Sequence, residues 1–398
     1  MNTPLDGIRV VDLTTTFLGP YTTMLMARMG ADVVKVETHD GDVLRHVGSG
    51  RSPGMGPIFL AANHGKRSIA LDLKTHGGRD AMRALVAGAD AFVTNMRPQA
   101  VARLGLDPDE LCAADERLVY VALRGFGEAG PYRDRAAYDD VVQAASGLAG
   151  LQGDDGEPDY VRSVVADKTV AVMGLAAVNA ALFARERTGR GGFTEVPMFE
   201  TMASFVLLEQ QNARVLDPDA PTGYARTASP HRRPYRTADG YLGVLVYTDK
   251  QWLAFFELIG RPELASDPRF ATITDRTRHT DELYALLADE MPARTTADWV
   301  AAFEPLGIPA QPVLAPDDLF DDPHLAVVGM FGTVEHSREG DYTLPRLPLT
   351  FDGEHAPAVR GAPRLGEHGD EVLREAGVPV EEITRLRAEG VLGGRPGG

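Results

Sequence analysis

The chain has 398 residues, of which 44% are hydrophobic and 24% are charged, a composition typical of a soluble globular protein whose length predicts more than one domain. Its formal net charge of −17 argues against non-specific binding to nucleic acid or to an anionic membrane. The single cysteine, Cys112, excludes an internal disulfide and a cysteine-rich metal site, and it is typical of a reducing compartment.

Short β-rich runs alternate with helix-period segments over the first 125 residues. The predicted strands are Ile8–Leu13, Asp32–Glu37, Ser68–Leu73, Ala91–Asn95 and Leu118–Leu123. The predicted helices are Tyr21–Met29, Gly78–Ala87, Ala100–Leu104 and Pro108–Ala113. This alternation predicts an α/β fold, with a large doubly wound, Rossmann-like parallel sheet whose ligand site lies at the carboxyl ends of the strands.

The first strand–turn–helix unit imitates a dinucleotide-binding motif without its glycines. Only Gly19, followed by Pro20, stands where three spaced glycines would let a pyrophosphate approach. A simple turn into a helix is therefore favoured over nicotinamide or flavin binding.

Basic residues gather beside the ends of the predicted strands, at Lys66, Arg67 and Lys74 and again at Arg97 and Arg103. They are equally typical of a solvated surface and of a polyphosphate site, and the sequence leaves both interpretations open.

The longest apolar run, Val170–Ala184, predicts a buried helix, because its hydrophobicity is not confined to one face. Asp167 stands where an N-cap belongs and Gly189 where the helix ends, so a plain capping role is the first interpretation of Asp167 and catalysis the second. The run is shorter than the ~20 residues that span a bilayer. With no signal-peptide pattern at the N-terminus, we expect a cytoplasmic protein with no membrane contact.

A second, smaller α+β domain is predicted after this stretch. A strand Phe193–Met198 and a helix Met202–Gln210 precede an aperiodic connector, and then come a hairpin Tyr235–Tyr247, a helix capped by Asp249, and helices Asp281–Ala288 and Ala297–Phe303. The domains expected are residues 1–212 (large), 213–234 (connector), 235–326 (small α+β) and 327–398, a segment that returns to the large domain and ends in the glycine-rich Leu392–Gly398.

Several catalytic classes lack their motifs. The ten histidines show no metal-ligand spacing, so no metal site is expected. Neither GxSxG nor a P-loop is present, which disfavours a serine hydrolase and a nucleoside triphosphatase.

Nine segments in order resemble the class III CoA-transferases, the family of formyl-CoA transferase and carnitine CoA-transferase. They are PLDGIRVVDLT with Gly19-Pro20, GADVVKVE, NHGKRSIALDLK, the Asn95 to Arg103 segment, YDDVVQAASGL, the Asp167 stretch, RTGRGG, GIPAQPV and LGEHGDEVL. The resemblance covers nearly the whole chain. It implies an interlocked homodimer with the active site near the subunit interface, which the long connector would suit.

The resemblance also implies the chemistry: CoA moves from an acyl-CoA donor to a small carboxylic acid, with no tightly bound cofactor. Asp167 would attack the thioester to give an aspartyl–acyl anhydride and then an aspartyl-CoA thioester. We expect its carboxylate to be ionised at neutral pH without a base, kept so by the helix N-terminus.

The residues that the resemblance assigns to CoA are Leu71, Asp72, Leu73, Lys74, Asn95, Met96, Arg97, Arg103, Ala136, Ala137, Tyr138 and Asp139. Two positions depart from formyl-CoA transferase: Phe17 stands where that enzyme has a glutamine, and Thr38 where it has a phosphate-binding arginine. HRRPYRTADG occupies the region of its glycine-rich lid. Formyl or oxalyl specificity is therefore not expected.

Two alternatives remain open. A 2-methylacyl-CoA racemase of the same fold would have a histidine at the position of Tyr138, and a phenol is a poor proton shuttle at neutral pH. A non-catalytic CoA-binding protein would use the same pocket without chemistry.

For the substrate, Arg232, Arg233 and Arg236 either bind the second carboxylate of a dicarboxylic acid, with succinyl-CoA as donor, or belong to a solvated connector.

Overall fold

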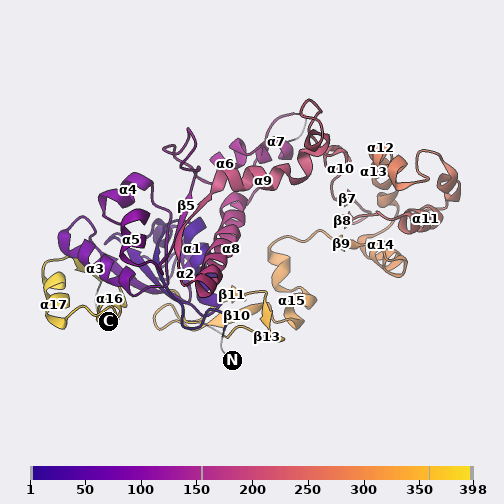
Figure 1. Ribbon diagram of the computed structural model, residues 1–398. Coiled ribbons are helices and arrows are strands. Elements are labelled where there is room, and N and C mark those ends of the chain that lie inside the picture. Colours follow the sequence, from indigo (N-terminus) through magenta and orange to yellow (C-terminus); the bar gives the residue numbers. More distant parts are fainter. Residues whose placement is uncertain (1–2, 154–155, 358, 395–398) are drawn as a thin grey trace. The chain divides into compact units, whose positions relative to one another are not determined.

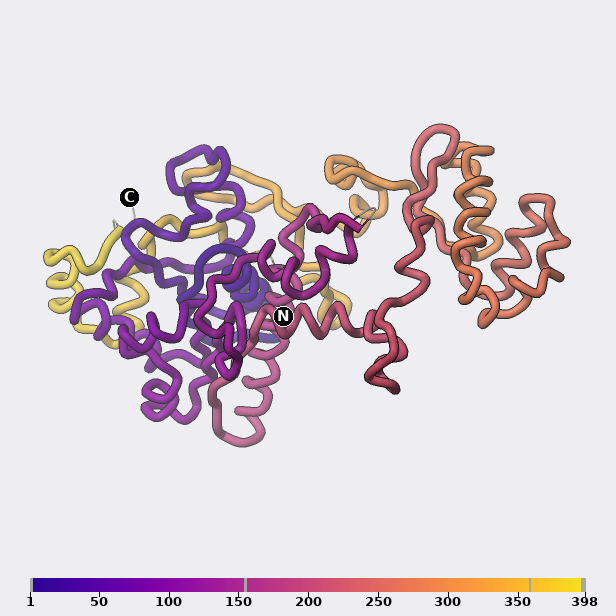
Figure 2. The backbone as a smooth tube through the Cα atoms, turned by 90° about the horizontal axis from the view of Figure 1, so that it is seen from above, coloured from indigo at the N-terminus to yellow at the C-terminus, as the bar shows by residue number. Residues whose placement is uncertain are grey.

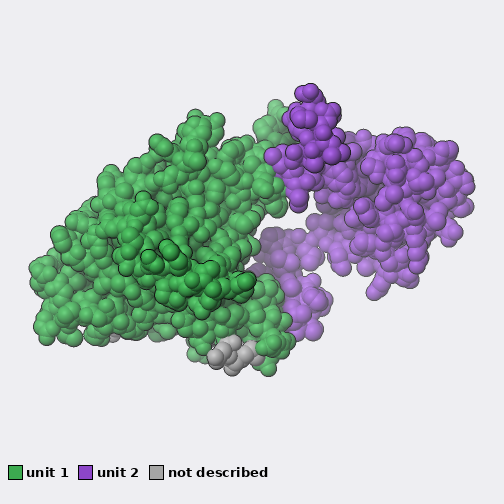
Figure 3. All heavy atoms as spheres, viewed as in Figure 1, with its two compact units in different colours: residues 1–205, 329–398 green, residues 206–328 purple. Residues whose placement is uncertain are grey.

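A computed structural model describes residues 3–153, 156–357 and 359–394. The chain divides into two compact units, Met1–Phe205 with Gly329–Gly398 and Val206–Val328, which Figure 3 shows in different colours. Each unit has a hydrophobic core of its own.

The first unit is built on a seven-stranded sheet of order β14-β3-β2-β1-β4-β5-β6 (Figure 1). Its strands are β1 (Arg9–Leu13), β2 (Asp32–Glu37), β3 (Arg67–Leu71), β4 (Ala91–Thr94), β5 (Val119–Arg124), β6 (Gly192–Pro197) and β14 (Leu392–Gly393). All pair in parallel except β14, which is antiparallel to β3. The order β3-β2-β1-β4-β5-β6 is that of dinucleotide-binding folds, so the predicted large parallel-sheet domain is confirmed.

Helices cover both faces of this sheet (Figure 1). On one face lie α3 (His76–Ala87), α4 (Pro98–Arg103), α5 (Pro108–Ala114), α16 (Gly369–Glu375) and α17 (Val380–Ala388). On the other, α1 (Leu18–Arg28) packs against α8 (Val165–Thr188) and α2 (Pro57–Asn63). The remaining helices of this unit are α6 (Asp139–Ala145), α7 (Leu148–Gln152) and the first part of α9 (Met198–Gln210). Gly174 of α8 allows close packing against α1 and β5, because a Cβ there would lie 3.1 Å from Oγ1 of Thr22 and 3.0 Å from Cδ2 of Leu123.

The C-terminal segment completes the first unit, and Figure 2 shows it beside α3 although it is far from α3 in sequence. Its strands are β10 (Phe331–Val334), β11 (Tyr342–Pro345), β12 (Thr350–Phe351) and β13 (Glu354–His355). The start of the glycine-rich end, expected to be poorly ordered, is the edge strand β14, so that expectation is wrong for Leu392 and Gly393. The last four residues of the chain lie outside the described part.

The second unit packs helices against a three-stranded sheet, β7 (Tyr235–Arg236), β8 (Tyr241–Val244) and β9 (Ala310–Pro312). Its helices are α10 (Ala225–Ala228), α11 (Asp249–Leu258), α12 (Ile273–Arg278), α13 (Thr280–Glu290), α14 (Thr296–Phe303) and α15 (Pro323–Val327). The core is aromatic, with Trp299 and Phe303 stacked 5.0 Å apart. Thr248 caps α11 in a capping box with Gln251, so the prediction of Asp249 as the cap is wrong.

Helix α8 begins earlier than the sequence predicts. Its N-cap is Val164, without a side-chain cap, and Asp167 lies in its first turn, so the prediction of Asp167 as the N-cap is wrong. The helix has 24 residues and exposes 52% of Val172 and 64% of Phe183, so it is not buried all round within a single chain. Over the described residues it is the one helix long and apolar enough to cross a membrane by composition, because it extends beyond the predicted run Val170–Ala184 at both ends. Core helices pass the same test.

The basic segment after α2 turns inward rather than forming a surface or a phosphate site. Lys66 is fully buried and its ammonium lies 3.0 Å from the Asp12 carboxylate. Beside this pair, the Lys35 ammonium lies 2.9 Å from the Asp42 carboxylate. Arg67, also buried, pairs with carboxylates of β2 and α16. We refer to Asp12, Lys35, Asp42 and Lys66 as the buried charge cluster.

The buried charge cluster holds the loop that follows β1. Asp12 accepts a hydrogen bond from the Thr14 amide at 3.0 Å, and Lys35 donates to the Thr14 carbonyl at 2.8 Å. Burial raises the pKa of Asp12, but the ammonium groups of Lys66 and Lys35 outweigh it and leave the pKa below its ordinary value. Asp12 is therefore ionised around neutral pH, and Lys66, whose pKa burial lowers to about 8, is still mostly protonated there. Removing one partner leaves an uncompensated buried charge.

The Lys66→Met substitution tests this dependence. It preserves most of the side-chain length and removes the charge opposite Asp12, so we expect the free energy of unfolding to fall by about 3–5 kcal/mol. Urea unfolding followed by fluorescence measures it. Arg83→Met is the control, because Arg83 is an exposed partner of Asp80 and Glu110, and its loss should change stability by less than about 1 kcal/mol. Equal losses in the two variants would contradict a special role for the cluster.

Candidate active site

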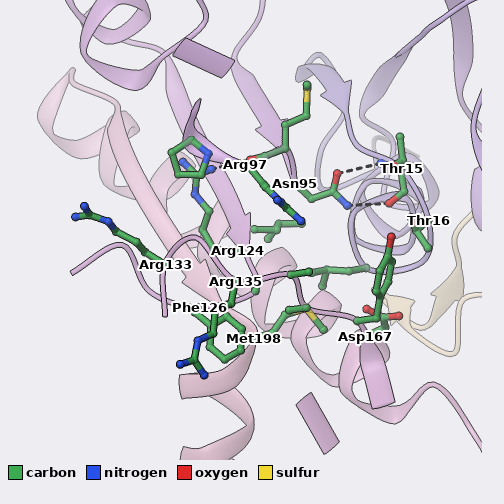
Figure 4. A pocket seen from close by; sticks show the side chains of 18 residues that line it. Thr15, Thr16, Asn95, Arg97, Arg124, Phe126, Arg133, Arg135, Asp167 and Met198 are labelled. Carbon is green, nitrogen blue, oxygen red and sulfur yellow. Dashed lines mark hydrogen bonds between the residues drawn. The ribbon is translucent and has the colours of Figure 1, made fainter. Parts of the chain in front are cut away.

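A pocket of about 200 Å³ opens where the strand order of the first unit reverses, between β1 and β4. Parallel sheets of this kind bind ligands at that crevice, outside the carboxyl ends of the strands. The pocket is lined by Thr15, Thr16, Leu18, Asn95, Met96, Arg97, Pro98, Leu123, Arg124, Gly125, Phe126, Arg133, Arg135, Ala136, Ala137, Tyr138, Asp167 and Met198. Figure 4 shows Asp167 on the other side of the pocket from Arg133.

The loop after β1 forms one wall and is held in an unusual backbone conformation. The amide of Asn95 exchanges two hydrogen bonds with the Thr15 backbone, at 3.0 Å and 2.8 Å, the dashed lines of Figure 4. Thr16 has a φ of 71°, in a region that non-glycine residues rarely occupy, and its amide donates to Asp42 at 3.2 Å. A β-branched residue keeps that conformation only where its surroundings impose it, and here Asn95 and Asp42 do so.

Asp167 is positioned by the first turn of α8 and by a second carboxylate behind it. Asp139, at the start of α6, accepts the Asp167 backbone N–H at 2.9 Å, and Gln143 donates to the other Asp139 oxygen at 2.6 Å. Asp139 therefore satisfies one free amide of the α8 N-terminus, the task that the sequence assigned to Asp167 itself. The Asp167 side chain is left to face the pocket.

The Asp167 carboxyl is only partly ionised at neutral pH. Burial, together with the negative charges of Asp139 and Asp140, raises its pKa to about 7. The expectation that the helix N-terminus keeps it fully ionised is therefore wrong: burial and two neighbouring carboxylates outweigh the helix dipole. Within the described residues, no side chain donates a hydrogen bond to this carboxylate.

The pocket wall away from Asp167 carries positive charge. Arg124, at the end of β5, is buried and donates to the Met96 carbonyl at 2.6 Å, while its Nε makes no hydrogen bond within the described residues and lies 4.0 Å from the Glu195 carboxylate. Arg97, Arg133 and Arg135 line the same pocket and are exposed. In a protein of net charge −17, these four guanidinium groups at one crevice could hold an anionic ligand.

Sequence reasoning missed most of these arginines. Arg124 follows directly on a predicted strand, at the end where parallel sheets bind ligands, and that position was the available signal. Arg133 and Arg135 lie in an irregular loop before Tyr138, and no local pattern of the sequence marks them. Thr15 and Thr16 were likewise passed over, because a positive φ at a threonine has no sequence signature.

The residues assigned to CoA fall into two groups. Asn95, Met96, Arg97, Ala136, Ala137 and Tyr138 line the pocket together with Asp167. Leu71, Asp72, Leu73, Lys74 and Arg103 do not line it, and Asp139 lies behind Asp167. Leu71 is completely buried in the core, Asp72 accepts the Lys74 amide at 3.0 Å, and Lys74 and Arg103 are exposed. The CoA contacts of both groups stay predictions.

The positions that differ from formyl-CoA transferase also have a place in the first unit. Phe17 is half-buried at the end of the loop after β1, and Thr38 is exposed just after β2. Within the described part of the chain, no three His, Cys, Asp or Glu side chains are grouped to hold a metal ion.

Comparison with known proteins gives consistent matches over the whole chain. Residues 5–369 match the sequence model described as CoA-transferase family III. The chain is 33% identical over 395 residues to a succinate–glutarate CoA-transferase of Agrobacterium fabrum, covering 96% of this chain and 97% of the relative. It is also 33% identical over 413 residues to a formyl-CoA:oxalate CoA-transferase of Streptomyces avermitilis, with 98% and 100% covered. A solved CAIB/BAIF family protein from Brucella suis is 32% identical with a TM-score of 0.79, over 94% of this chain and 100% of that one.

The raised pKa of Asp167 predicts how stability depends on pH. Because the folded chain binds this proton more tightly than the unfolded chain, ionisation of Asp167 opposes folding between the unfolded pKa near 4 and the folded value of about 7. Asp167→Asn should therefore be more stable than the wild type by up to about 4 kcal/mol at pH 8, and by little at pH 4. Thermal unfolding of both proteins across this range measures the difference. A constant difference at every pH would contradict the raised pKa.

Proposed function

The chain belongs to CoA-transferase family III and is a CoA-transferase, and we propose that it moves CoA from an acyl-CoA to a free carboxylic acid through covalent intermediates on Asp167. The family match confirms the resemblance predicted from the nine sequence segments. The observation that carries the proposed mechanism is the placement of the Asp167 carboxylate in the same pocket as four arginines. CoA brings its phosphates to the arginines and its thioester to the carboxylate.

The proposed reaction has four balanced steps. The Asp167 carboxylate attacks the donor thioester carbonyl, the carbon–sulfur bond breaks, and CoA thiolate leaves an aspartyl–acyl anhydride. The thiolate then attacks the Asp167 carbonyl of the anhydride, releasing the donor acid and forming an aspartyl-CoA thioester. The acceptor carboxylate attacks this thioester to give a second anhydride and thiolate. Attack of the thiolate on the acceptor carbonyl forms the new acyl-CoA and frees Asp167.

The proposed sequence needs no resident base, since every nucleophile is already an anion: a carboxylate or a thiolate. Its requirement is a deprotonated Asp167 in the free enzyme, which a pKa of about 7 meets only in part at neutral pH. The burial that raises the pKa of Asp167 also excludes water, which would hydrolyse an anhydride or a thioester.

We assign the anionic part of CoA to the arginine side of the pocket. Arg97, Arg124, Arg133 and Arg135 offer charge-assisted hydrogen bonds to phosphate, and Asn95 is fixed by its bonds to Thr15. Leu71 to Lys74, which follow the carboxyl end of β3, and Arg103, at the end of α4, would contact the nucleotide end if it extends along the strand ends. Ala136 to Tyr138 would cover the pantetheine arm.

The racemase alternative has less support. Tyr138 lines the pocket at the position where a racemase would have its histidine, and it is 68% exposed. A neutral phenol is a poor general base, so it would remove the α-proton of a substrate inefficiently.

We also propose that the protein acts as an interlocked homodimer in the cytoplasm. A single chain leaves Val172, Met173 and Phe183 of α8 and Phe205 of α9 half or more exposed, an apolar surface that a second copy would cover.

For the substrate, we propose a dicarboxylic acyl group such as succinyl, in keeping with the named substrates of the Agrobacterium relative.

Asp167→Ala tests the nucleophile. We expect exchange of CoA between a thioester and a free acid to fall by at least about a thousandfold, because no other group can form the anhydride. Mass spectrometry of the CoA products measures it. Asp140→Ala is the matched control, since Asp140 is an exposed neighbouring carboxylate outside the pocket lining, and it should keep most of the exchange.

A chemical trap separates this proposal from non-catalytic binding. Hydroxylamine added with an acyl-CoA should convert Asp167 to its hydroxamate, found in the peptide that contains it. CoA binding with no exchange and no hydroxamate would sink the transferase mechanism in favour of a CoA-binding protein. Incorporation of solvent deuterium into a 2-methylacyl-CoA without any acceptor would instead identify a racemase.

Asp139→Asn should shift the pH dependence of the reaction. Rates should rise with pH through about 7 in the wild type, as Asp167 becomes a carboxylate. Removing the Asp139 charge lowers the pKa of Asp167, so the acid limb of the profile should move to lower pH, while the Asn amide oxygen still accepts the Asp167 N–H. Initial rates of exchange from pH 5 to 9 measure the limb. An unmoved limb would show that Asp139 does not influence this titration.

A further inference from the structure

Asp167 also lines a second cavity, distinct from the arginine pocket. It has a volume of about 420 Å³, and Asp167 and Phe17 are among its lining residues. Its wall is mainly apolar, with Met24, Leu25, Ile58, Met330, Leu344 and Leu347. All of these belong to the first unit. The arginine pocket has a different, polar lining, so Asp167 stands between two cavities of different chemistry.

Among the described residues, one buried cation of this apolar cavity has no carboxylate within ion-pair distance. Arg28, the last residue of α1, is only 9% exposed, and within the described residues no carboxylate lies within 4.0 Å of its guanidinium. Its Nε has no hydrogen-bond partner there either. A charge in an apolar wall is costly unless it is paired, so an isolated guanidinium at this place indicates a missing anion.

The neighbours of Arg28 orient the guanidinium but do not neutralise it. Its Nη1 lies 2.7 Å from Nε2 of His64 and 3.3 Å from the Pro345 carbonyl. Burial and the charge of Arg28 lower the pKa of His64 to about 4, so His64 is neutral at pH 7 and its Nε2 accepts the bond. Nδ1 of His64 then donates to the Ala61 carbonyl at 2.9 Å. The other charged groups of the cavity lining are Lys168 and Arg346, both cationic, and Asp167.

We propose that this cavity holds the acyl group during transfer and that Arg28 binds a second carboxylate at the far end of that group. This inference rests on the proposed function, because it places the acyl carbonyl at Asp167, and it extends it by naming the group that selects dicarboxylic acids. The apolar wall contacts the methylene chain, and the terminal carboxylate forms a charge-assisted pair with Arg28. A monocarboxylic acyl group would fill the same wall and leave Arg28 unpaired.

The assignment differs from the one suggested by the sequence, in which arginines of the connector recognise the second carboxylate. Arg232 and Arg233 line a separate pocket of the second unit, together with Tyr235 and Gln311, and Arg236 does not line it. Asp167 is no part of that pocket. Arg28 lines a cavity that contains the proposed nucleophile itself.

The test compares two thioesters that differ at the far end of the acyl chain. Exchange of isotope-labelled succinate into succinyl-CoA, and of labelled butyrate into butyryl-CoA, is measured for the wild type, Arg28→Met, Arg28→Lys and the remote control Arg83→Met. We expect the wild type to prefer succinyl-CoA, and Arg28→Met to lose about 10- to 100-fold in kcat/KM for succinyl-CoA, with less than about a threefold change for butyryl-CoA. Arg28→Lys should recover part of the loss, and Arg83→Met should match the wild type.

The outcomes separate this inference from the function on which it rests. Asp167-dependent exchange with equal rates for the two thioesters in the wild type, or a succinyl preference that survives Arg28→Met, would overturn the role of Arg28 and leave the transferase mechanism standing. Absence of any exchange with either thioester would overturn the proposed function, and this inference with it. Butyryl-CoA exchange in Arg28→Met shows that the variant is folded. Should that variant fail to fold, the wild-type preference and Arg28→Lys still decide.

Discussion

The buried charge cluster is the constraint on which the candidate site depends. Asp12 and Lys35 hold the two backbone groups of Thr14, and Asp42 holds the Thr16 amide in a conformation with positive φ. The next residue, Phe17, lines the apolar cavity, whereas Thr15 and Thr16 line the arginine pocket. The buried charge cluster thus fixes the loop Thr14–Phe17, whose residues line both cavities. Apolar side chains of the same volume could not form hydrogen bonds to these backbone groups.

The environment of Asp167 lowers the free energy of unfolding of the protein. A carboxyl with a pKa near 7 in the folded chain opposes folding whenever it is ionised, and Asp139 and Asp140 increase that cost. The same environment would serve the proposed chemistry, because a poorly solvated carboxylate to which no described side chain donates a hydrogen bond is a better nucleophile than one stabilised by a cap. Asp139 contributes by accepting the backbone N–H of Asp167, so that this free helix amide is satisfied without the Asp167 carboxylate.

The sequence predicted the large sheet well, because parallel strands buried on both faces are continuous apolar runs and the helices between them have clear periods. The roles of Asp167 as nucleophile and of Asn95, Met96 and Arg97 as CoA contacts came from the family resemblance, not from periodicity. What could not be predicted depends on tertiary contacts: Lys66 and Arg67 were equally typical of a surface, and only the sheet register places them beside Asp12 and Asp32. The pKa of Asp167 belongs to the same class, since its cause is burial and neighbouring carboxylates from another helix.

The position of Asp167 between two cavities relates the choice of donor to the choice of acceptor. In the proposed sequence of steps, CoA remains on the arginine side while one acid leaves the anhydride and the other replaces it. Both acids then occupy the apolar cavity in turn and meet the same Arg28 and the same apolar wall. A site of this kind cannot select a dicarboxylic donor and a monocarboxylic acceptor with equal strength, because the buried guanidinium would be unpaired in one half of the reaction. The donor and the acceptor should therefore belong to one chemical class, differing in chain length or substitution rather than in charge.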